Sequence, residues 1–385
     1  MTGVAGERFP HSSDSTDVLG QIERVPDVEA PDLVAVDATD RLLLDTAAGL
    51  IAAAPGAVAV VDDSYGALTL GAVAGHGATA VRVHQDLLVG ERALDRNAGR
   101  TALTGTYRSL PLGPELTEGA RVVLVKAPKS LDALREIAEV VAAAAAPDVT
   151  VLVGGRVKHM THAMNDVLRE CFADVTAGLA RQKSRVLTAR GPRAVAPSFP
   201  RCETHADLGL TLCAHGAAFA GARIDIGTRA LLAVLDRAMP GAGSAVDLGC
   251  GTGLLAAALA GARPDLSVTA TDQSAAAVAS ARATMAANGL ADRVSVTRDD
   301  AASELPGAAT DLVVCNPPFH LGVAVVTPVA DRLVAGAARV LRPGGELWVV
   351  SNTALRHGPA LSRLVGPTRV VHRTPKFTVT VSTRR

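Results

Sequence analysis

Short apolar segments alternate with alanine-rich segments along the C-terminal half of the chain. Five segments have the length and composition of strands: residues 244–250, 266–272, 293–299, 311–316 and 345–352. Helical composition lies between them, from Ser274 to Asn288 and from Pro328 to Leu341. Strands that alternate with helices predict a parallel sheet with helices on both faces. In such a sheet we expect the ligand site at the carboxyl ends of the strands.

The N-terminal half repeats this order more faintly. Its strand-like segments lie within residues 57–68, 121–130 and 148–155. The separation along the chain from Asp62 to Lys126 is close to that from Asp247 to Asn316. We infer an internal duplication, with accidental similarity of spacing as the alternative. The expected fold class is therefore α/β, with two tandem Rossmann-like domains. The N-terminal copy is degenerate, because Gly66 stands where the second copy has three glycines.

A length of 385 residues with 48% apolar content also favours two packed domains. We expect a flexible arm over residues 1–30, the degenerate domain over 31–180, a basic linker with three prolines over 181–206, and the catalytic domain over 207–385. The N-terminus has no basic start followed by an apolar stretch, so we predict no secretion signal. No apolar run reaches the ~18 residues of a membrane-spanning helix.

Charge and cysteine content narrow the class of protein further. A net charge of zero argues against a uniformly basic nucleic-acid binder, but two acid-free stretches stand out, residues 181–201 and 347–385. Such stretches favour local phosphate binding, with ordinary solvated surfaces as the alternative. The five cysteines show no C-x-x-C spacing, so we expect reduced thiols, no metal site and a cytoplasmic protein. Cys250 and Cys315 are interpreted as small apolar side chains.

The segment "VDLGCGTGLL" (246–255) has the pattern of a strand, a glycine-rich turn and a helix. Gly249, Gly251 and Gly253 allow a sharp turn and close approach of a ligand to the backbone. The preceding carboxylate, Asp247, would repel a pyrophosphate but could hold an amino group. The loop therefore favours a ligand that carries an ammonium group.

Further carboxylates follow the next two strands. Asp272 can accept hydrogen bonds from both hydroxyls of a ribose. Asp300, with Asp299 as the alternative, is placed to accept a hydrogen bond from an adenine amino group. A ligand that combines an amino acid, a ribose and an adenine is S-adenosylmethionine.

The segment "DLVVCNPPFH" (311–320) ends a strand in a rigid corner. The side-chain oxygen of Asn316 and the carbonyl of Pro317 can accept the two hydrogens of an exocyclic amine on a base. The lone pair of the nitrogen would then point at the methyl donor, and orientation would supply most of the acceleration. Pro318 completes the corner, and Phe319 could stack on an unpaired or flipped base.

These motifs resemble those of the ribosomal RNA guanine-N2 methyltransferases. The resemblance rests on "VDLGCGTG", "DQSAAAVASARATMAANG" and "NPPFH", on "GAAFAGARIDIGTRALL" before the glycine loop, and on "LRPGGELWVVSN" and "KFTV" near the C-terminus. In the N-terminal half, "VVDDSYGAL", "VVLVKAPKSLDAL" and "LARQKSRVL" resemble the degenerate first domain of the type that modifies large-subunit RNA. One departure is Gly-Ala-Ala-Phe-Ala, where the family usually has Val-Phe-Ser.

The resemblance implies a class I methyltransferase fold and N2 methylation of a guanine in ribosomal RNA. The resemblance of the N-terminal half favours large-subunit RNA as the substrate. Cofactor binding would fall to Asp247, Gly249, Gly251, Gly253 and Asp272, with Phe219, Asp225 and Thr228 on the cofactor side. The amine would be positioned by Asn316, Pro317, Pro318 and Phe319. The first domain would engage ribosomal RNA or a ribosomal subunit precursor through Lys126, Lys129, Arg156, Lys158 and residues 181–201.

The sequence leaves open other substrates and one other class of protein. The same chemistry could act on a small-subunit guanine, on adenine N6 or on a protein glutamine. A glutamine enzyme more often has Tyr than Phe after the two prolines, and a DNA adenine enzyme usually adds a large target-recognition domain. A non-catalytic RNA-binding assembly factor is the alternative from another class, and cofactor binding would distinguish it from an enzyme.

Overall fold

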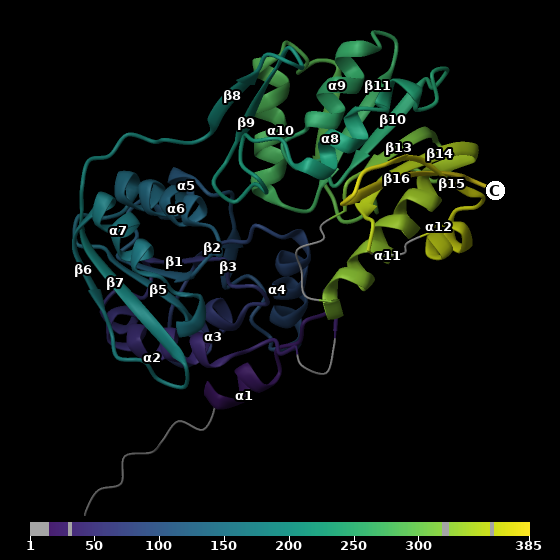
Figure 1. Cartoon of the computed structure of the whole chain (residues 1–385). Helices are drawn as coiled ribbons and strands as arrows, with labels where there is room; N and C mark the ends of the chain where they lie inside the picture. The colour runs from purple at the N-terminus through teal and green to yellow at the C-terminus, as the bar shows by residue number, and fades with distance from the viewer. Residues whose placement is uncertain (1–14, 30–32, 318–322, 355–357) are drawn as a thin grey trace, which may run out of the picture.

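The computed structural model describes residues 15–29, 33–317, 323–354 and 358–385. Two α/β domains lie side by side, each built around a seven-stranded sheet, and a two-stranded sheet lies between them along the chain (Figure 1). The fold class expected from the sequence is confirmed.

The first sheet has the strand order β3-β2-β1-β4-β5-β7-β6. Its strands are β1 (Val58–Val61), β2 (Val81–His84), β3 (Tyr107–Ser109), β4 (Val122–Lys126), β5 (Thr150–Arg156), β6 (Phe172–Ala177) and β7 (Ser184–Pro192). Strands β1 to β5 pair in parallel, and β7 is antiparallel to both of its neighbours.

The second sheet repeats this arrangement strand for strand, in the order β12-β11-β10-β13-β14-β16-β15. Its strands are β10 (Ser244–Leu248), β11 (Ser267–Asp272), β12 (Val294–Arg298), β13 (Thr310–Cys315), β14 (Leu341–Asn352), β15 (Thr368–Arg373) and β16 (Phe377–Thr383). Here too the first five pair in parallel, and β16 is antiparallel to its neighbours. The common topology is what an internal duplication predicts.

Helices cover both faces of each sheet. The first domain contains α1 (Ser15–Gly20), α2 (Ala38–Ala53), α3 (Ala67–His76), α4 (Leu88–Arg100), α5 (Pro114–Thr117), α6 (Leu131–Ala144), the 3₁₀ turn η1 (Val157–His159) and α7 (His162–Cys171). The second contains α8 (Ile226–Leu232), the 3₁₀ turn η2 (Leu235–Arg237), α9 (Leu254–Ala262), α10 (Ala275–Ala287), α11 (Val323–Val340) and α12 (Gly358–Leu364). Helices α2 to α4 pack on one face of the first sheet and α5 to α7 on the other. In the second domain, α8 to α10 pack on one face of the sheet, and α11 and α12 pack on the other.

The loop after the first strand of each sheet shows how far the copies remain alike. Three positions of this loop have left-handed backbone in both domains. The φ angles are 60°, 67° and 101° at Asp62, Ser64 and Gly66, and 73°, 54° and 78° at Gly249, Gly251 and Gly253. The first copy has therefore kept the backbone path while losing two glycines. This costs about 1–2 kcal/mol at each non-glycine position.

The linker expected over residues 181–206 is wrong in its first half. Residues 184–192 form β7, which lies between β5 and β6 and carries buried side chains such as Val186 and Leu187. The sequence suggested a linker because residues 181–206 contain three prolines and a run of basic residues. In the structure Val186 and Leu187 pack on opposite faces of the sheet, so the strand is covered on both sides at these positions. The first domain thus extends to about the end of β7, and the basic residues of this strand belong to its sheet.

The flexible arm expected over residues 1–30 is also wrong for the part that the structure describes, since residues 1–14 and 30 lie outside it. Helix α1 and the segment after it pack on the first domain, with Ile22 only 7% exposed. Arg24 lies over the ring of Tyr65, 4.6 Å from its centroid, and pairs with Asp27 at 3.0 Å. Tyr65 in turn donates a hydrogen bond to Asp27 at 2.6 Å. The contacts with Tyr65 join residues far apart in sequence, so the local composition did not reveal them.

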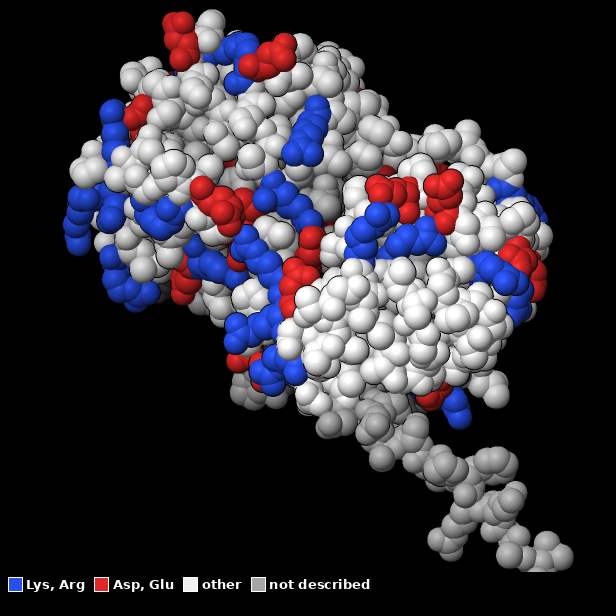
Figure 2. All heavy atoms as spheres, turned by 180° about the vertical axis from the view of Figure 1, so that it is seen from behind, with Lys and Arg blue, Asp and Glu red and all other residues white. Residues whose placement is uncertain are grey.

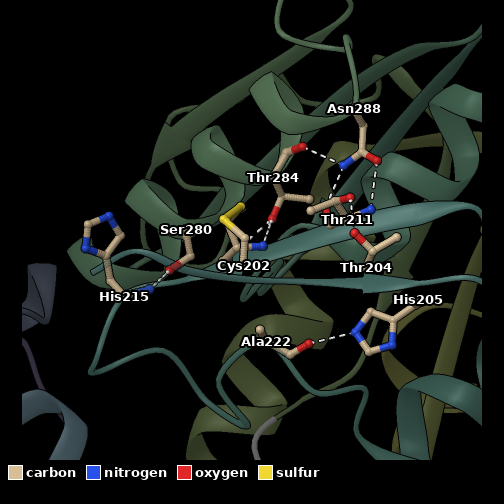
Figure 3. The surroundings of a disulfide bond; sticks show 10 residues. Cys202, Thr204, His205, Thr211, His215, Ala222, Ser280, Thr284 and Asn288 are labelled. Carbon is tan, nitrogen blue, oxygen red and sulfur yellow. Dashed lines mark hydrogen bonds between the residues drawn. A yellow bond between two sulfur atoms is a disulfide. The ribbon is translucent and has the colours of Figure 1, made fainter. Parts of the chain in front are cut away.

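The expectation of five reduced thiols is wrong for one pair. Strands β8 (Arg201–His205) and β9 (Leu210–Ala214) form an antiparallel hairpin whose register places Cys202 opposite Cys213, and the two cysteines form a disulfide (Figure 3). Cross-strand pairing brings two cysteines 11 residues apart into contact without any C-x-x-C spacing. Cys171, Cys250 and Cys315 are buried free thiols, in agreement with the interpretation of Cys250 and Cys315 as apolar side chains.

We expect three of the five cysteines to react when the protein is purified without reductant, unfolded and alkylated. The disulfide protects Cys202 and Cys213, while unfolding exposes the three free thiols. Intact mass spectrometry before and after reduction checks this count. Alkylation of all five cysteines without reductant would show that the pair is not oxidised in the isolated protein.

Candidate active site

Three neighbouring strands of the second sheet end at the same level. Leu248 on β10 pairs with Thr271 on β11 and with Cys315 on β13. The residues that follow on the three strands are Gly249, Asp272 and Asn316. The strand order reverses direction between β10 and β13, which is where ligands bind in open α/β sheets. The structure therefore brings the main predicted site residues to one edge.

The glycine loop between β10 and α9 is shaped for close approach of a ligand. A Cβ added to Gly249 or Gly251 would meet no atom within 4 Å, so the backbone at both positions borders open space. A Cβ at Gly253 would come within 2.9 Å of the Met285 side chain, so this glycine is needed for packing against α10. The amide of Gly249 donates to the carbonyl of Thr271 at 2.8 Å, which ties the loop to β11.

Asp247 is buried beneath this loop. Its Oδ2 accepts a hydrogen bond from the amide of Ala256 at 3.0 Å, whereas its Oδ1 has no partner among the described residues. Burial raises the pKa of Asp247 to about 7, the hydrogen bond from Ala256 opposes this shift, and the nearby Asp272 adds to it. A buried acceptor without a partner is costly, so Oδ1 is suited to a hydrogen-bond donor from a ligand.

Asp272 connects the glycine loop to α10. Its Oδ2 accepts from the amide of Gly251 at 3.0 Å, and its Oδ1 accepts from the amide of Ser274 at 2.9 Å. Burial raises the pKa of Asp272 despite these two hydrogen bonds. Each carboxylate oxygen has a second lone pair, so the group can also accept hydrogen bonds from ligand hydroxyls.

The two carboxylates after β12 have different surroundings. Asp299 accepts hydrogen bonds from the Ser303 hydroxyl at 2.6 Å and the Glu304 amide at 3.0 Å, so it caps a local turn. Asp300 pairs with Arg332 of α11 at 2.9 Å, and burial raises its pKa while Arg332 opposes that shift. Of the two, Asp300 has fewer local hydrogen bonds and remains the candidate for the adenine amino group.

Asn316 is held by the start of α8. Its Nδ2 donates to the Thr228 hydroxyl at 2.8 Å and to Oδ2 of Asp225 at 3.3 Å. Because a carboxylate only accepts, the nitrogen of the amide must face Asp225, and Oδ1 must face away from it. The same Asp225 oxygen caps α8 through the amides of Gly227 and Thr228. Asp225 and Thr228 therefore contact the predicted catalytic residue directly, a role that the sequence did not reveal.

The remaining predicted site residues are less closely defined. Pro317 is buried next to Asn316, and it lines a small cavity of about 10 Å³ together with residues of α11, α12 and β14. Phe219 is 57% exposed, in the turn before α8. Pro318 and Phe319 lie outside the described residues.

The turn that carries Phe219 is fastened to the first domain. Oε2 of Glu136 on α6 accepts from the amide of Gly216 at 2.7 Å, and its Oε1 lies 2.5 Å from Nδ1 of His215. A Cβ at Gly216 would lie 2.3 Å from the carbonyl oxygen of Asp132, so no side chain fits there. The close approach of the two domains therefore requires a glycine at this position.

The basic residues considered for RNA binding separate into two groups. Lys126 forms ion pairs with Asp37 and Asp40 inside the first domain, so two carboxylates already compensate its charge. Arg181 and Lys183 are exposed in the turn between β6 and β7, and Lys158 is exposed in η1. The amide of Val157 donates to the carbonyl of Lys183 at 2.9 Å, which brings this turn and η1 together.

Charged side chains of one sign do not dominate the face shown in Figure 2. Lys and Arg side chains lie beside Asp and Glu side chains over much of it, and a broad face of the first domain, at the lower right, carries neither. Within the described ranges, no group of three or more His, Cys, Asp or Glu side chains could hold a metal ion. No helix in those ranges is long and apolar enough to cross a membrane.

Two family models match the chain, one over each domain. The model described as "RLMG N-terminal domain" matches residues 11–193, and the "Methyltransferase small domain" matches residues 209–381. Among solved structures, the T. thermophilus 16S rRNA N2 G1207 methyltransferase (RsmC), in complex with AdoMet and guanosine, has a TM-score of 0.73. It is 24% identical, over 91% of this chain and 92% of that chain, and it confirms the fold.

Curated relatives are similar over nearly their whole length. A ribosomal RNA large subunit methyltransferase G of Pseudomonas aeruginosa (strain UCBPP-PA14) is 36% identical over 363 residues, which cover 92% of this chain and 95% of the relative. A protein of the same name from Streptomyces coelicolor is 35% identical over 380 residues, covering 93% and 96%. With both domains matched in order, the chain belongs to the ribosomal RNA large subunit methyltransferase G family.

Proposed function

We propose that this protein uses S-adenosylmethionine to methylate the exocyclic N2 amine of a guanine in large-subunit ribosomal RNA. The names of the relatives support a large-subunit RNA substrate, and the structurally similar N2 G1207 methyltransferase, which binds guanosine, supports N2 of guanine. The observation that carries the proposal is the amide of Asn316, which Thr228 and Asp225 hold in one orientation beside the glycine loop. A substrate of this kind also implies a cytoplasmic enzyme.

The residues present fit the cofactor. Open space at Gly249 and Gly251 leaves room for the ligand at the loop, and Oδ1 of Asp247 offers a free acceptor for its ammonium group. Asp272 would accept from the ribose hydroxyls and Asp300 from the adenine amino group, with Phe219 at the edge of the site. When bound, S-adenosylmethionine supplies a methyl group on a positively charged sulfur, which an amine can attack.

The role of the Asn316 corner follows from the chemistry of the substrate. The lone pair of an exocyclic amine is delocalised into the base, so the amine is a poor nucleophile. Hydrogen bonds from its two N–H groups to Oδ1 of Asn316 and to the carbonyl of Pro317 would turn the lone pair out of the ring plane. Orientation of this kind supplies a large part of the barrier reduction without a strong base. Pro318 and Phe319 would complete the pocket for the base.

For RNA engagement, the exposed cations Lys158, Arg181 and Lys183 are the strongest candidates of the first domain. Residues Arg363, Arg369, Arg373 and Lys376 are exposed on the second domain. Cations on both domains could contact phosphates on either side of the target base, an interaction that weakens with salt.

The test offers the purified protein and methyl-labelled cofactor separately to protein-free small-subunit and large-subunit RNA and to assembled subunits. The labelled nucleoside is then identified by mass spectrometry, with the Asn316→Ala variant as the inactive control. N2-methylguanosine in large-subunit RNA or particles would support the proposal. Label in N6-methyladenosine, in small-subunit RNA or in protein would keep the enzyme and replace the substrate. Cofactor binding without any transfer would favour an assembly factor.

We expect S-adenosylmethionine to bind about fivefold more tightly at pH 7 than at pH 6, because a carboxyl with a pKa of about 7 goes from about a tenth to about half ionised. The sign follows from the charge: the ammonium group needs the ionised form of Asp247, so affinity rises with pH and levels off above the pKa. Calorimetry at several pH values measures this.

The control ligand is 5′-methylthioadenosine, which keeps the ribose and adenine but lacks the amino acid. Its affinity should depend less on pH, because it makes no contact with Asp247. The same pH dependence for both ligands would contradict the assignment of Asp247 and would point to Asp272, whose pKa is also raised.

A further inference from the structure

The two domains meet at their equivalent ligand edges. The segment after β2 lies against the segment after β11, with an antiparallel bridge between Leu87 and Ser274. The amide of Leu88 donates to the carbonyl of Gln273 at 3.0 Å, and the amide of Ala275 donates to the carbonyl of Asp86 at 2.8 Å. Backbone pairing of this kind fixes the two segments relative to each other.

Gln85 occupies in the first domain the place that Asp272 occupies in the second. Its Oε1 accepts from the amide of Ser64 at 3.0 Å, as Oδ2 of Asp272 accepts from Gly251 at 3.0 Å. Its Nε2 is buried without a partner among the described residues. At the edge that corresponds to the ligand edge of the second domain, the first domain thus has the amide of Gln85 in place of the Asp272 carboxylate. This edge of the first domain faces the second domain.

Asp86, the residue after Gln85, caps helix α10 of the second domain. Its Oδ1 accepts from the Ser274 hydroxyl and from the amide of Ala276, both at 2.9 Å. Its carbonyl accepts from Ala275, and the Ser274 hydroxyl oxygen accepts from Ala277 at 3.1 Å. The first three amides of α10 are therefore all satisfied, and two of them are satisfied by the first domain. Helix starts need such partners.

This cap is directly linked to the predicted ribose-binding group. The amide of Ser274 donates to Oδ1 of Asp272 at 2.9 Å while the Ser274 hydroxyl donates to Asp86. Arg298, at the end of β12, reinforces the contact: it pairs with Glu91 of α4 at 2.6 Å and donates to the carbonyls of Gln85 at 2.8 Å and Asp86 at 3.1 Å.

The remainder of α10 is held by another element. Side chains at a spacing of four residues on one face of the helix, Ser280, Thr284 and Asn288, form hydrogen bonds with the backbone of β9 and of His215, which follows it (Figure 3). The hairpin of β8 and β9 thus fixes the middle and end of α10. The start of the helix, next to Asp272, depends on Asp86.

We propose that Asp86 is a positioning residue for cofactor binding. By capping α10 and holding Ser274, it keeps the Asp272 carboxylate in the orientation that accepts the ribose hydroxyls. The first domain therefore contributes to the cofactor site of the second domain. It does so through the segment after β2, which corresponds to the ligand edge of the second domain. The inference rests on the assignment of Asp272 to the cofactor in the proposed function.

The test uses the full chain with Asp86→Ala and Asp86→Asn, and calorimetry with S-adenosylmethionine. Loss of a cap leaves the binding-competent arrangement only partly populated, and we expect about tenfold weaker binding for Asp86→Ala. Asp86→Asn keeps an acceptor and should lie between that variant and the wild type. The turnover number at saturating cofactor should be unchanged, so that the effect appears in KM for the cofactor.

Asp37→Ala is the matched control. Asp37 caps α2 of the first domain through the amides of Thr39 and Asp40 and pairs with Lys126, and all of these partners belong to the first domain. The variant should lower the thermal stability and leave cofactor affinity unchanged. Equal weakening by Asp37→Ala and Asp86→Ala would show a general loss of stability and overturn the proposal.

Three further measurements test the proposal. A lower melting temperature of Asp86→Ala with wild-type affinity would overturn the positioning role. If Asp86→Ala does not fold, Glu91→Gln removes only the ion pair with Arg298: weaker cofactor binding would support the proposal, and unchanged binding would overturn it. A wild-type affinity of Asp272→Ala would overturn the cofactor-site assignment itself, and with it this inference.

Discussion

Replacing Asn316 by Ala should lower kcat by at least about a hundredfold, the scale seen when a preorganised hydrogen-bonding group is removed from a reacting centre. The side chain would no longer accept from the target amine, whose lone pair would stay in the plane of the base. The affinity for S-adenosylmethionine should be unchanged, because the predicted contacts of Asn316 are with the substrate. Single-turnover methylation of ribosomal RNA, together with cofactor titration, separates the two quantities.

Asn316→Asp tests the orientation of the amide. The new carboxylate would face Asp225, and two carboxylates in contact repel each other, so we expect a loss at least as large. The matched control is Asn165→Ala, because Asn165 is a half-buried asparagine of α7 in the first domain that donates to the carbonyl of His162. A wild-type kcat for Asn316→Ala would remove Asn316 from the mechanism.

Replacing Asp272 by Ala should weaken S-adenosylmethionine binding by at least about a hundredfold, since hydrogen bonds to a charged group contribute about 1.5–3 kcal/mol each. Two ribose hydroxyls would lose their acceptor, and the amides of Gly251 and Ser274 would lose their partner. The glycine loop and the start of α10 would then no longer be tied together. Calorimetry with the cofactor measures the loss.

The control for this variant is Asp265→Asn, which removes an exposed carboxylate just before β11 in the same domain. Its affinity for the cofactor should equal that of the wild type. If Asp272→Ala bound the cofactor normally, the ribose would have to be recognised elsewhere, and Asp300 would be the next carboxylate to test.

Much of the fold was predictable because its signals are local. Strands such as 244–248 and 267–272 are short apolar runs, and the three glycines of the loop directly indicate its left-handed backbone conformation. The errors arose where the decisive partner is distant in sequence. β7 was interpreted as a linker because prolines and basic residues are frequent in residues 181–206, although the strand pairs with β5, and the cysteine pair was missed because only the register of β8 and β9 joins it.

By itself, the sequence determined the α/β class, the tandem arrangement of two such domains, and the residues that end neighbouring strands, because strand periodicity and turn residues depend on consecutive positions. Only the tertiary structure decided that Thr228 and Asp225 orient Asn316, that Lys126 is paired inside the first domain, and that Asp86 caps a helix of the second domain. Each of these contacts joins residues from separate elements. Which of many exposed or charged side chains meet depends on how the sheets and helices pack, and no local pattern records that.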